Sequence, residues 1–546
     1  MKIALAQLNY CIGDFSSNID KIISVLNDEK ERGTDLVVFA EMSVCGYLPN
    51  DFLNYNQFVI KCQESIEQIA QHAVGIACIV GAPEVNPILE GKDLYNSAFF
   101  FEEGAVKQVV RKSLLPTYDI FDEYRYFESA VDFKCIEFKG YKIAVTICED
   151  LWNLGNNPLY KSCPMDELIK EEPDFMINIA ASPFDYKHEE QRLMILSQNS
   201  RKYQLPLLYV NQVGANTDLI FDGGSLVFDK AGDIVAELAY FKEDVQVFNI
   251  EQLRSSIVLG EKSIQKERVG QVYEALVLGI RDYFHKSGFR TATLGLSGGI
   301  DSAVVCALAV EALGAENVFP VLLPSKYSSD HSIKDAIDLA NNLGCQYTTI
   351  PITKITESFE ESLADEFAGL PQNLAEENIQ ARTRGVLLMA FSNKFGHILL
   401  NTSNKSECAV GYGTLYGDMC GAISVIGDCY KTQVYKLADY INREREIIPK
   451  NTITKAPSAE LRPDQKDSDS LPEYDLLDEI LLEYIEMQKS ADEIIEAGFD
   501  SPVVHRVTNL VNKAEFKRFQ TAPILRISPK SFGIGRRMPI VAKYKF

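Results

Sequence analysis

The sequence predicts an α/β protein built from two domains. Two long stretches alternate short β-rich runs with polar helical segments, and a charged segment with few strand-forming residues separates them. The length of 546 residues exceeds what one hydrophobic core usually serves, while 46% apolar and 24% charged residues are typical of globular proteins. We therefore expect one domain over residues 1–250, a linker over 251–270 and a second domain over 271–546.

Strand-like runs and polar helices alternate through the first domain. Helices are expected over the polar stretches 18–32 and 188–203. The strands are expected in the runs IALAQ, LVVFAE, IACIVGAP, KIAVTICED, FMINIAAS and LPLLYVNQ.

A second alternation begins at residue 293, after an amphipathic helix expected over residues 271–285. Its order is strand TLGL, loop SGGIDS, helix AVVCALAVEAL, strand FPVLLP, helix SIKDAIDLANNL, strand CQYTTIPI, helix ENIQARTRGVLLMAFSNKF and strand HILLNTS. Repeated βαβ units predict a parallel sheet that binds ligands at the carboxyl ends of its strands. Two acidic, proline-bearing stretches, 362–377 and 457–474, are predicted to be solvated loops.

The composition limits the classes of function that the protein can have. No run reaches the roughly eighteen apolar residues of a membrane span, and the first residues lack the pattern of an export signal. The 12 cysteines contain no CxxC pair, which argues against a disulfide framework or zinc ribbon and favours a reducing cytosol. The net charge of −23 argues against a nucleic-acid-binding surface. We expect a cytoplasmic protein without nucleic-acid or membrane partners.

Three residues of the first domain stand at the ends of predicted elements. They are Glu41 after LVVFA, Lys112 before SLLP and Cys148 after KIAVTI. The acidic residues Glu149 and Asp150 that follow the cysteine make it a poor nucleophile by itself, so it would need a base and a cation nearby. Each residue alone also has a structural explanation, as a buried small thiol or a surface charge at a strand end.

The segments around these residues resemble the nitrilase, or carbon–nitrogen hydrolase, superfamily. The segments FAEMSVCGY, RKSLLPTYDIFDEYRYF, VTICEDLW and NIAASPF occur in the same order and at similar separations. The resemblance implies an αββα sandwich in which Glu41 is the general base, Lys112 the stabilising cation and Cys148 the nucleophile. It also implies that Glu123 orients Lys112.

If the amide substrate is glutamine, the same resemblance implies contacts to its amino-acid end from Tyr118 and Ser182. Relatives have a basic partner six residues after this serine. In this sequence His188 occupies that place and Lys187 precedes it. We assign the contact to Lys187, and His188 stays an alternative.

The loop SGGIDS of the second domain has the composition of a phosphate-binding turn. Its glycines let the backbone close around phosphate oxygens, the following helix directs N–H groups at them, and an aspartate can hold magnesium. Without a GK[ST] sequence it is not a Walker loop, and it resembles the pyrophosphate loop of enzymes that split ATP between the α and β phosphates. The expected ATP contacts here are Gly295, Leu296, Ser297, Gly298, Gly299, Ile300, Asp301 and Ser302.

Six further segments look like the NAD synthetase family: AEENIQARTRG, NTSNKSE, GYGTLYGD, KTQVYKLA, PSAELRPDQ and EFKRFQ. The resemblance implies a Rossmann-like sheet of the pyrophosphate-loop ATPase type, with segments 325–332 and 458–471 as mobile loops over the site. It implies ATP contacts from Thr402 and Lys431, deamido-NAD contacts from Asn378, Arg382, Glu407 and Lys517, and a magnesium site at Asp301 and Glu407. Apart from the family, Glu407 fits a surface residue and Lys517 a solvated basic patch.

Together, the two resemblances cover nearly the whole chain in the order found in glutamine-dependent NAD synthetases. They imply a ligase that hydrolyses glutamine and uses the ammonia to amidate deamido-NAD through an acyl-adenylate, with ATP and Mg²⁺. The products would be NAD, AMP, pyrophosphate and glutamate, and a homo-oligomer is expected. Three alternatives stay open: a different carboxylate acceptor, a tRNA-thiolating enzyme, and a non-catalytic assembly protein.

Overall fold

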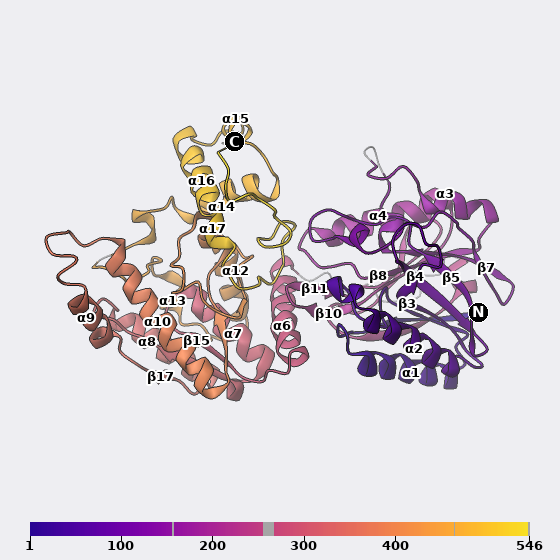
Figure 1. The fold of residues 1–546 in the computed structure, drawn as a ribbon, viewed down its shortest axis with the longest axis horizontal. Helices are drawn as coiled ribbons and strands as arrows, with labels where there is room; N and C mark the ends of the chain where they lie inside the picture. The colour runs from indigo at the N-terminus through magenta and orange to yellow at the C-terminus, as the bar shows by residue number, and fades with distance from the viewer. Residues whose placement is uncertain (155–157, 255–266, 464, 544–546) are drawn as a thin grey trace. The chain divides into compact units, whose positions relative to one another are not determined.

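The computed structural model describes residues 1–154, 158–254, 267–463 and 465–543. The chain divides into two compact units, Met1–Gln265 and Lys266–Phe546 (Figure 1). The expected linker over 251–270 lies mostly outside the described residues. Its described ends belong to helices α5 (Ile250–Arg254) and α6 (Arg268–Lys286).

In its described residues, the first unit has two six-stranded sheets and a hairpin. The first sheet has β1, β2 and β3 parallel and its other pairs antiparallel. Its order is β14 (Asp244–Asn249), β1 (Lys2–Gln7), β2 (Leu36–Phe39), β3 (Ala77–Val85), β4 (Leu94–Glu102) and β5 (Ala105–Arg111).

The second sheet also has a parallel centre, β7, β8 and β9, with antiparallel outer pairs. Its order is β13 (Ile234–Glu237), β12 (Leu226–Phe228), β9 (Leu207–Asn211), β8 (Phe175–Ala180), β7 (Tyr141–Ile147) and β6 (Ile136–Phe138). The hairpin consists of β10 (Val213–Asn216) and β11 (Leu219–Asp222).

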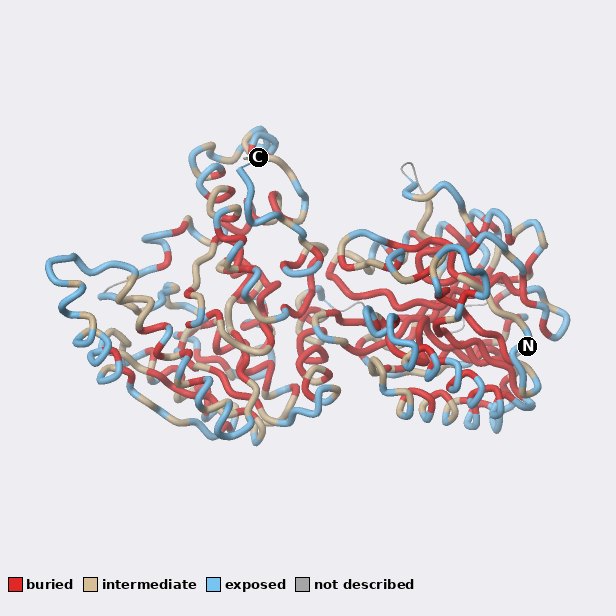
Figure 2. The backbone as a smooth tube through the Cα atoms, in the orientation of Figure 1, coloured by how far each residue is buried: buried red, intermediate tan, exposed pale blue. Residues whose placement is uncertain are grey.

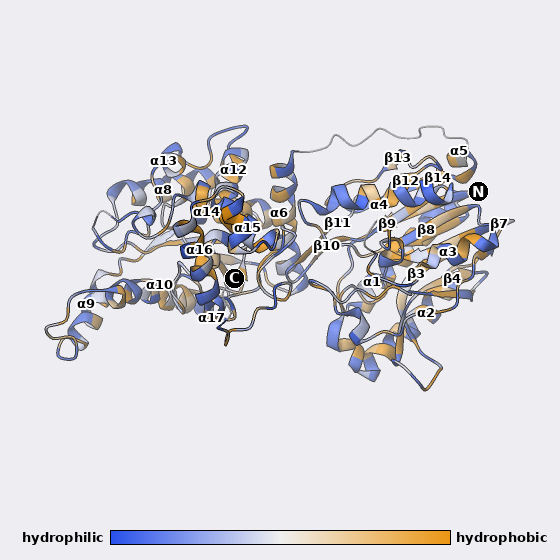
Figure 3. Cartoon of the chain, turned by 90° about the horizontal axis from the view of Figure 1, so that it is seen from above, coloured by the Kyte–Doolittle hydropathy of each residue, from blue (hydrophilic) through white to orange (hydrophobic). Residues whose placement is uncertain are grey.

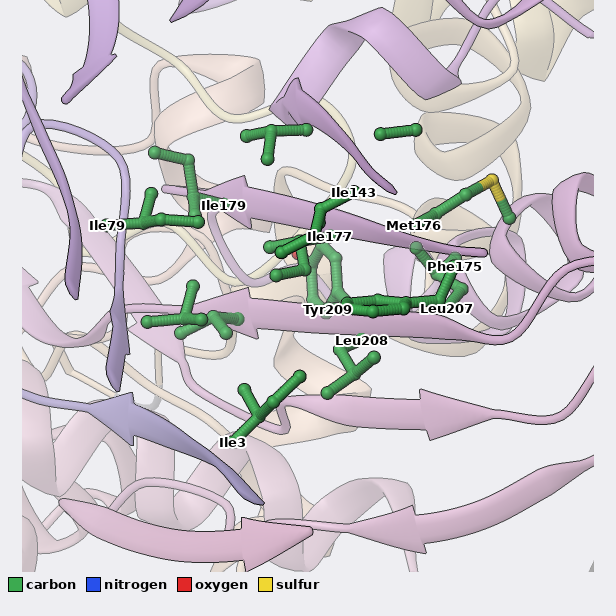
Figure 4. Close-up of a cluster of buried hydrophobic side chains, with 14 of the residues drawn as sticks. Ile3, Ile79, Ile143, Phe175, Met176, Ile177, Ile179, Leu207, Leu208 and Tyr209 are labelled. Carbon is green, nitrogen blue, oxygen red and sulfur yellow. The ribbon is translucent and has the colours of Figure 1, made fainter. Parts of the chain in front are cut away.

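The two sheets pack face to face around a shared apolar core. Ile3 and Ile79 from the first sheet meet Ile177 and Leu208 from the second (Figure 4). Because successive side chains of a strand point to opposite faces, neighbouring residues such as Ala4 belong to a different core, beneath the helices. The inner strands are buried on both faces, as Figure 2 shows for this unit, whereas the edge strands β5 and β14 are partly exposed.

Helices cover the outer face of each sheet. Apolar residues of α1 (Phe15–Glu31) and α2 (Asn56–His72) pack on β2 and β3, and α3 (Pro164–Leu168) and α4 (His188–Tyr203) pack on the second sheet. Their outward faces are hydrophilic (Figure 3). The expected αββα sandwich is therefore confirmed.

The second unit is built on a parallel sheet, as expected. In its described residues the order is β17 (Thr348–Thr349), β16 (Val318–Leu322), β15 (Ala292–Gly295), β18 (Ile398–Asn401) and β19 (Ile423–Ser424). The chain runs outward from β15 to β17 and then returns to β18 on the other side. This reversal makes the carboxyl ends of β15 and β18 a topological switch point, where such sheets bind ligands.

Helices surround this sheet. Helix α7 is apolar on all sides because it is buried, with Val304, Val305 and Leu308 fully enclosed. The bounds of the remaining helices after α6 are α7 Ile300–Leu313, α8 Asp330–Leu343, α9 Thr353–Ser362, α10 Leu374–Phe395, α11 Lys405–Val410, α12 Lys431–Ile441, α13 Lys450–Thr454, α14 Tyr474–Leu481, α15 Ala491–Glu496, α16 Ser501–Lys513 and α17 Glu515–Arg518.

A fully buried ammonium joins α11 to the C-terminal segment. Lys405 Nζ donates to Glu486 Oε1 at 2.9 Å, to Ser528 Oγ at 2.7 Å and to the carbonyl of Lys530 at 3.0 Å. It also pairs with Asp428 Oδ1 at 3.0 Å. A buried charge is tolerated only with such a full set of acceptors, so this cluster fixes where the last described segment packs.

Two details of the expected secondary structure are wrong. The run CQYTTIPI forms a strand over only Thr348–Thr349. This strand lies at the edge of the sheet, where it pairs with a neighbouring strand on one side alone. The stretch 362–377 is not loop throughout, because Asn373 caps α10 and accepts the N–H of Ala375. None of the described helices is long and apolar enough to cross a membrane.

Candidate active sites

Three side chains gather at the carboxyl ends of strands in the first unit. Glu41 follows β2, and Lys112 and Cys148 directly follow β5 and β7. Lys112 Nζ donates to Glu41 Oε1 at 2.8 Å, and Cys148 interacts electrostatically with both residues. The structure thus brings together the three residues that the sequence singled out.

A glycine allows the segment carrying Glu41 to lie directly against β3. A Cβ atom on Gly81 would lie 2.4 Å from the backbone nitrogen of Met42 and 2.6 Å from the carbonyl oxygen of Ala40. Both contacts are to backbone, so neither can be relieved by rotating a side chain. Any larger residue at position 81 would push the segment that carries Glu41 away from the sheet.

Fixed donors orient the Glu41 carboxylate, which is fully buried. Asn96 Nδ2 donates to Oε1 at 2.7 Å, and the backbone N–H of Ala181 donates to Oε2 at 2.9 Å. Together with Lys112, these donors hold both carboxylate oxygens.

A second carboxylate completes the surroundings of Lys112. Lys112 Nζ donates to Glu123 Oε1 at 2.8 Å, and the hydroxyl of Tyr47 donates to the same oxygen at 2.6 Å. Burial alone would lower the pKa of Lys112, but Glu123 and Glu41 raise that pKa well above its usual value. The site therefore contains a permanently charged ammonium fixed between two carboxylates.

The turn after β7 places Cys148 in an uncommon backbone conformation. Its φ is 44°, in the left-handed region that side chains other than glycine rarely adopt. The carboxylate of Asp150 accepts the N–H groups of Ser113 and Leu114 at 3.0 and 2.9 Å, and that of Ile147 at 3.1 Å. These bonds tie the turn to the segment that follows the buried lysine, and so fix the cysteine relative to it.

The thiol of Cys148 is protonated in this environment. Burial raises its pKa well above the usual value, Glu41 raises it further, and Lys112 lowers it. Among the charged groups, Glu41 interacts with the thiol most strongly. A thiol in this state needs a base to become nucleophilic, and Glu41 is placed to be that base.

Two tyrosines contact the acidic residue that follows Cys148. The hydroxyl of Tyr118 donates to Glu149 Oε1 at 3.0 Å, and the hydroxyl of Tyr160 donates to the same oxygen at 3.0 Å. Burial raises the pKa of Glu149 to about 7, although Lys112 and the two tyrosines oppose the rise. Tyr118, expected from the sequence, is thus joined by an acidic residue that immediately follows the cysteine.

Ser182 contacts the histidine of the two basic candidates. Ser182 Oγ lies 2.8 Å from His188 Nε2, and the His188 ring stacks on Trp152 with centroids 4.9 Å apart. Lys187 is the residue that precedes α4, and its ammonium lies 6.0 Å from the centre of the Tyr186 ring.

The second unit contains a cavity of about 640 Å³ at the carboxyl ends of β15, β16 and β18. The loop between β15 and α7 forms part of its wall. Of the residues expected from the sequence, those that line it are Gly295, Leu296, Ser297, Gly299, Ile300, Asp301, Ser302, Thr402, Glu407 and Lys431.

The loop after β15 is closed by glycine and serine contacts. Gly298 has a φ of 83°, and a Cβ there would lie 2.1 Å from the carbonyl oxygen of Ser332. The N–H of Gly299 donates to Ser297 Oγ, which lies 3.2 Å from Ser302 Oγ. The N-terminus of α7 follows at once, so its free N–H groups and the serine hydroxyls can bind an anion in the cavity.

Charged side chains meet on one side of this cavity. Lys431 Nζ lies 2.5 Å from Asp301 Oδ2 and 3.6 Å from Glu407 Oε1, and Asn404 Nδ2 donates to Asp301 Oδ1 at 3.0 Å. Burial raises the pKa of Glu407 to about 8, Asp301 raises it further by repulsion, and Lys431 lowers it. This arrangement favours binding of an additional cation beside the carboxylates.

Three further candidates, Asn378, Arg382 and Lys517, contact residues 411–415. They do not belong to the cavity wall. Lys517 is held by two backbone carbonyls, so its interpretation as a solvated basic patch is wrong. The contacts are Thr414 Oγ1 to Asn378 Oδ1 at 2.7 Å, Arg382 Nε to the Leu415 carbonyl at 3.2 Å, and Lys517 Nζ to the carbonyls of Gly411 and Gly413 at 2.8 and 2.7 Å.

The two expected loops over the cavity are joined to each other. Ser329 Oγ and Ser332 Oγ each donate to Glu460 Oε1 at 2.8 Å. Residues 325–332 and 458–471 are therefore connected by a single carboxylate in this structure.

Several site residues were missed by the sequence analysis. Glu149 was treated only as a carboxylate that raises the thiol pKa, although its place next to the cysteine could have marked it as a substrate contact. Nothing in the sequence pointed to Asn96 or Tyr160, because each is brought to its site by tertiary packing alone, and Asn404 was not singled out within the segment NTSNKSE.

The two units match two different protein families. Residues 2–256 match the carbon-nitrogen hydrolase family, and residues 272–521 match the NAD synthase family.

Proteins that combine both families resemble the chain over its whole length. It is 47% identical over 551 residues to the glutamine-dependent NAD(+) synthetase of Synechocystis sp., covering 99% of each chain. It is 40% identical to that of Thermotoga maritima, covering 100% of this chain and 99% of the relative. A solved structure of glutamine-dependent NAD+ synthetase from Acinetobacter baumannii in complex with adenosine diphosphate is 39% identical, with a TM-score of 0.78 and coverage of 99% and 98%.

Proposed function

The chain belongs to the glutamine-dependent NAD(+) synthetase family, and from this premise we propose how its residues divide the work. The enzyme is a ligase with glutamine as amide donor: its first unit hydrolyses glutamine, and its second amidates deamido-NAD to NAD with ATP. The observation that supports the division most directly is the contact of Lys112 with both Glu41 and Glu123 beside Cys148.

We propose that Cys148 is the nucleophile of glutamine hydrolysis. Glu41 takes the thiol proton as Cys148 Sγ attacks the side-chain amide carbon, and Lys112 stabilises the oxyanion that forms. The tetrahedral intermediate then expels ammonia, which leaves with the proton held by Glu41, and a thioester remains. Glu41 next activates water, which attacks the thioester and releases glutamate and the thiol.

The polar residues beside Cys148 suit the amino-acid end of glutamine. Glu149 supplies a buried negative charge next to the nucleophile, which is complementary to the substrate's ammonium group. Tyr118 and Ser182 supply hydroxyls, and His188 or Lys187 supplies the positive charge for the substrate carboxylate. The contact between Ser182 and His188 favours His188.

Glu149→Gln is expected to raise the KM for glutamine about tenfold to a hundredfold, because it removes a charge-assisted hydrogen bond to the ammonium. In the unchanged enzyme, kcat/KM for glutamine should fall as the pH drops below about 7, since Glu149 is then protonated and neutral. In Glu149→Gln, kcat/KM for glutamine should no longer fall as the pH drops below about 7.

The measurement is a pH profile of glutamine hydrolysis, with Glu167→Gln on the exposed face of α3 as the matched control. An unchanged KM in Glu149→Gln would refute the assignment. Ammonium-driven synthesis should not respond to either change.

In the second unit, the cavity is proposed to bind ATP. Ser297, Ser302 and the N-terminus of α7 supply donors to the phosphates, and Lys431 and Thr402 line the same cavity. The carboxylate of deamido-NAD attacks the α-phosphorus, pyrophosphate leaves with the electron pair of the broken bond, and ammonia later displaces AMP from the acyl-adenylate. Asn378, Arg382, Glu407 and Lys517 are the proposed deamido-NAD contacts.

The carboxylates of Asp301 and Glu407 fit a magnesium site. Both face Lys431, and the pKa of Glu407 is raised first by burial and then by repulsion from Asp301. Among the described residues, no group of three or more histidine, cysteine or acidic side chains could hold a metal by itself. This suits Mg²⁺, which usually takes one or two carboxylates together with substrate phosphates and would neutralise the pyrophosphate.

Incubation with deamido-NAD, ATP and magnesium tests the function as a whole. NAD should form with glutamine and also with ammonium as nitrogen donor, and other carboxylates in place of deamido-NAD should give no amide. Absence of NAD with both donors would refute the function, and amidation of another carboxylate would favour the alternative acceptor.

We further propose a homo-oligomer in the cytoplasm. The outer face of α10 exposes Val386 and Met389, with 66% and 41% of their surface accessible, which suits a subunit contact. All 12 cysteines are free thiols, which suits a reducing compartment.

A further inference from the structure

An arginine outside the set expected from the sequence faces the nucleotide cavity. Arg384 lies on α10 together with Ala381, Gly385 and Leu388, which also line the cavity. Positions three and four residues apart share one face of a helix. Arg382, two residues earlier, points elsewhere, to the carbonyl of Leu415.

The guanidinium of Arg384 is anchored at one end. Its Nε donates to the carbonyl of Leu323 at 3.0 Å, just beyond the end of β16. An arginine has five N–H donors, so its two terminal amino groups retain four. These four donors are available on the side of the cavity.

Arg384 has no carboxylate partner among the described residues, unlike other cations around the cavity. Lys431 pairs with Asp301 and Lys455 with Asp335. For Arg384, burial lowers the pKa to about 10, and Asp418 and Glu460 only partly oppose this. A desolvated cation without a paired anion is costly, and such a group is retained where a ligand supplies the opposite charge.

The anion that enters this cavity is the nucleotide. The loop at Ser297 and Ser302 lines the same space, whereas Asn378, Arg382 and Lys517 lie outside the cavity wall. The planar guanidinium matches the geometry of phosphoryl oxygens and can bind two of them at once. We infer that Arg384 binds phosphoryl oxygens of ATP, and that it keeps this contact while the deamido-NAD carboxylate displaces pyrophosphate from the α-phosphorus. The inference rests on the proposed role of the cavity as the ATP site.

The test uses ammonium-driven NAD synthesis by the full chain, so that glutamine hydrolysis does not enter the measurement. Arg384→Met is expected to raise the KM for ATP about tenfold to a hundredfold, and the KM for deamido-NAD should stay within about twofold. Arg384→Lys should recover part of the loss, since it keeps the charge but not the two-pronged geometry. Arg384→Gln, which keeps a donor for the Leu323 carbonyl, serves if the methionine variant does not fold.

Lys394→Met is the matched control, because Lys394 is exposed on the same helix and its loss changes the net charge equally. It should leave both KM values unchanged. If the folded Arg384 variants keep the KM for ATP, or raise only that for deamido-NAD, the inference is overturned. Lys431→Met separates this failure from a wrong ATP site: if it too leaves the KM for ATP unchanged, the cavity itself was misassigned.

Discussion

Replacing Cys148 by alanine is expected to abolish NAD synthesis from glutamine while preserving synthesis from ammonium. The alanine has no sulfur to attack the amide, so glutamine-driven turnover should fall by at least about a thousandfold. The second unit still binds ATP and deamido-NAD, and external ammonium replaces the missing product of the first unit. Steady-state assays with each nitrogen donor measure the two activities on one preparation.

Cys163→Ala provides the matched control, because Cys163 lies in the same unit and contacts Tyr203 instead of the site. This variant should retain both activities within about twofold, as expected for a substitution far from the chemistry. If Cys148→Ala lost both activities while remaining folded, the division of labour between the units would be wrong.

Replacing Asp301 by alanine is expected to reduce NAD synthesis with either nitrogen donor while preserving glutamine hydrolysis. Asp301 holds Lys431 and Asn404 in the nucleotide cavity and is a proposed magnesium ligand. Without Asp301, NAD synthesis should fall about a hundredfold to a thousandfold or more with either nitrogen donor. The reason is that Lys431 and the proposed magnesium are then no longer held in place beside the phosphates. Glutamine hydrolysis, measured as glutamate released, should persist at least in part.

Asp338→Ala tests the specificity of this result, because Asp338 pairs with Lys334 on the surface of α8. It should behave as the unchanged enzyme in both assays. Full loss of glutamine hydrolysis in folded Asp301→Ala would contradict the assignment of Asp301 to the synthetase site alone. Retention of synthesis would contradict its role altogether.

The sequence predicted those parts of the fold that depend on local patterns. Buried parallel strands such as β8 and β9 appear as continuous apolar runs, and α4 was predicted over its full length as a polar stretch between two such runs. The catalytic candidates were found because each stands at the end of a predicted element, in a segment that resembles a known family. The loop before α7 was found because its residues are contiguous.

What the sequence could not predict depends on contacts between distant residues. Asn96 reaches Glu41 across 55 positions, and Arg384 reaches the carbonyl of Leu323 across 61. Neither residue type is unusual in its own segment. The distinction between Arg382 and Arg384 needs the orientation of α10 on the sheet, and the sequence of that helix has no clear amphipathic pattern that would reveal it.

The buried cluster around Lys405 has a consequence for how the polypeptide matures. Its acceptor at Lys530 is synthesised 125 residues after the lysine itself. At about 5 to 20 residues per second, a ribosome needs on the order of ten seconds to cover that distance. Throughout this interval the ammonium must stay hydrated, so α11 cannot settle into its final place. The synthetase half therefore completes its folding only near the end of translation, whereas the glutaminase half has all its strands available much earlier.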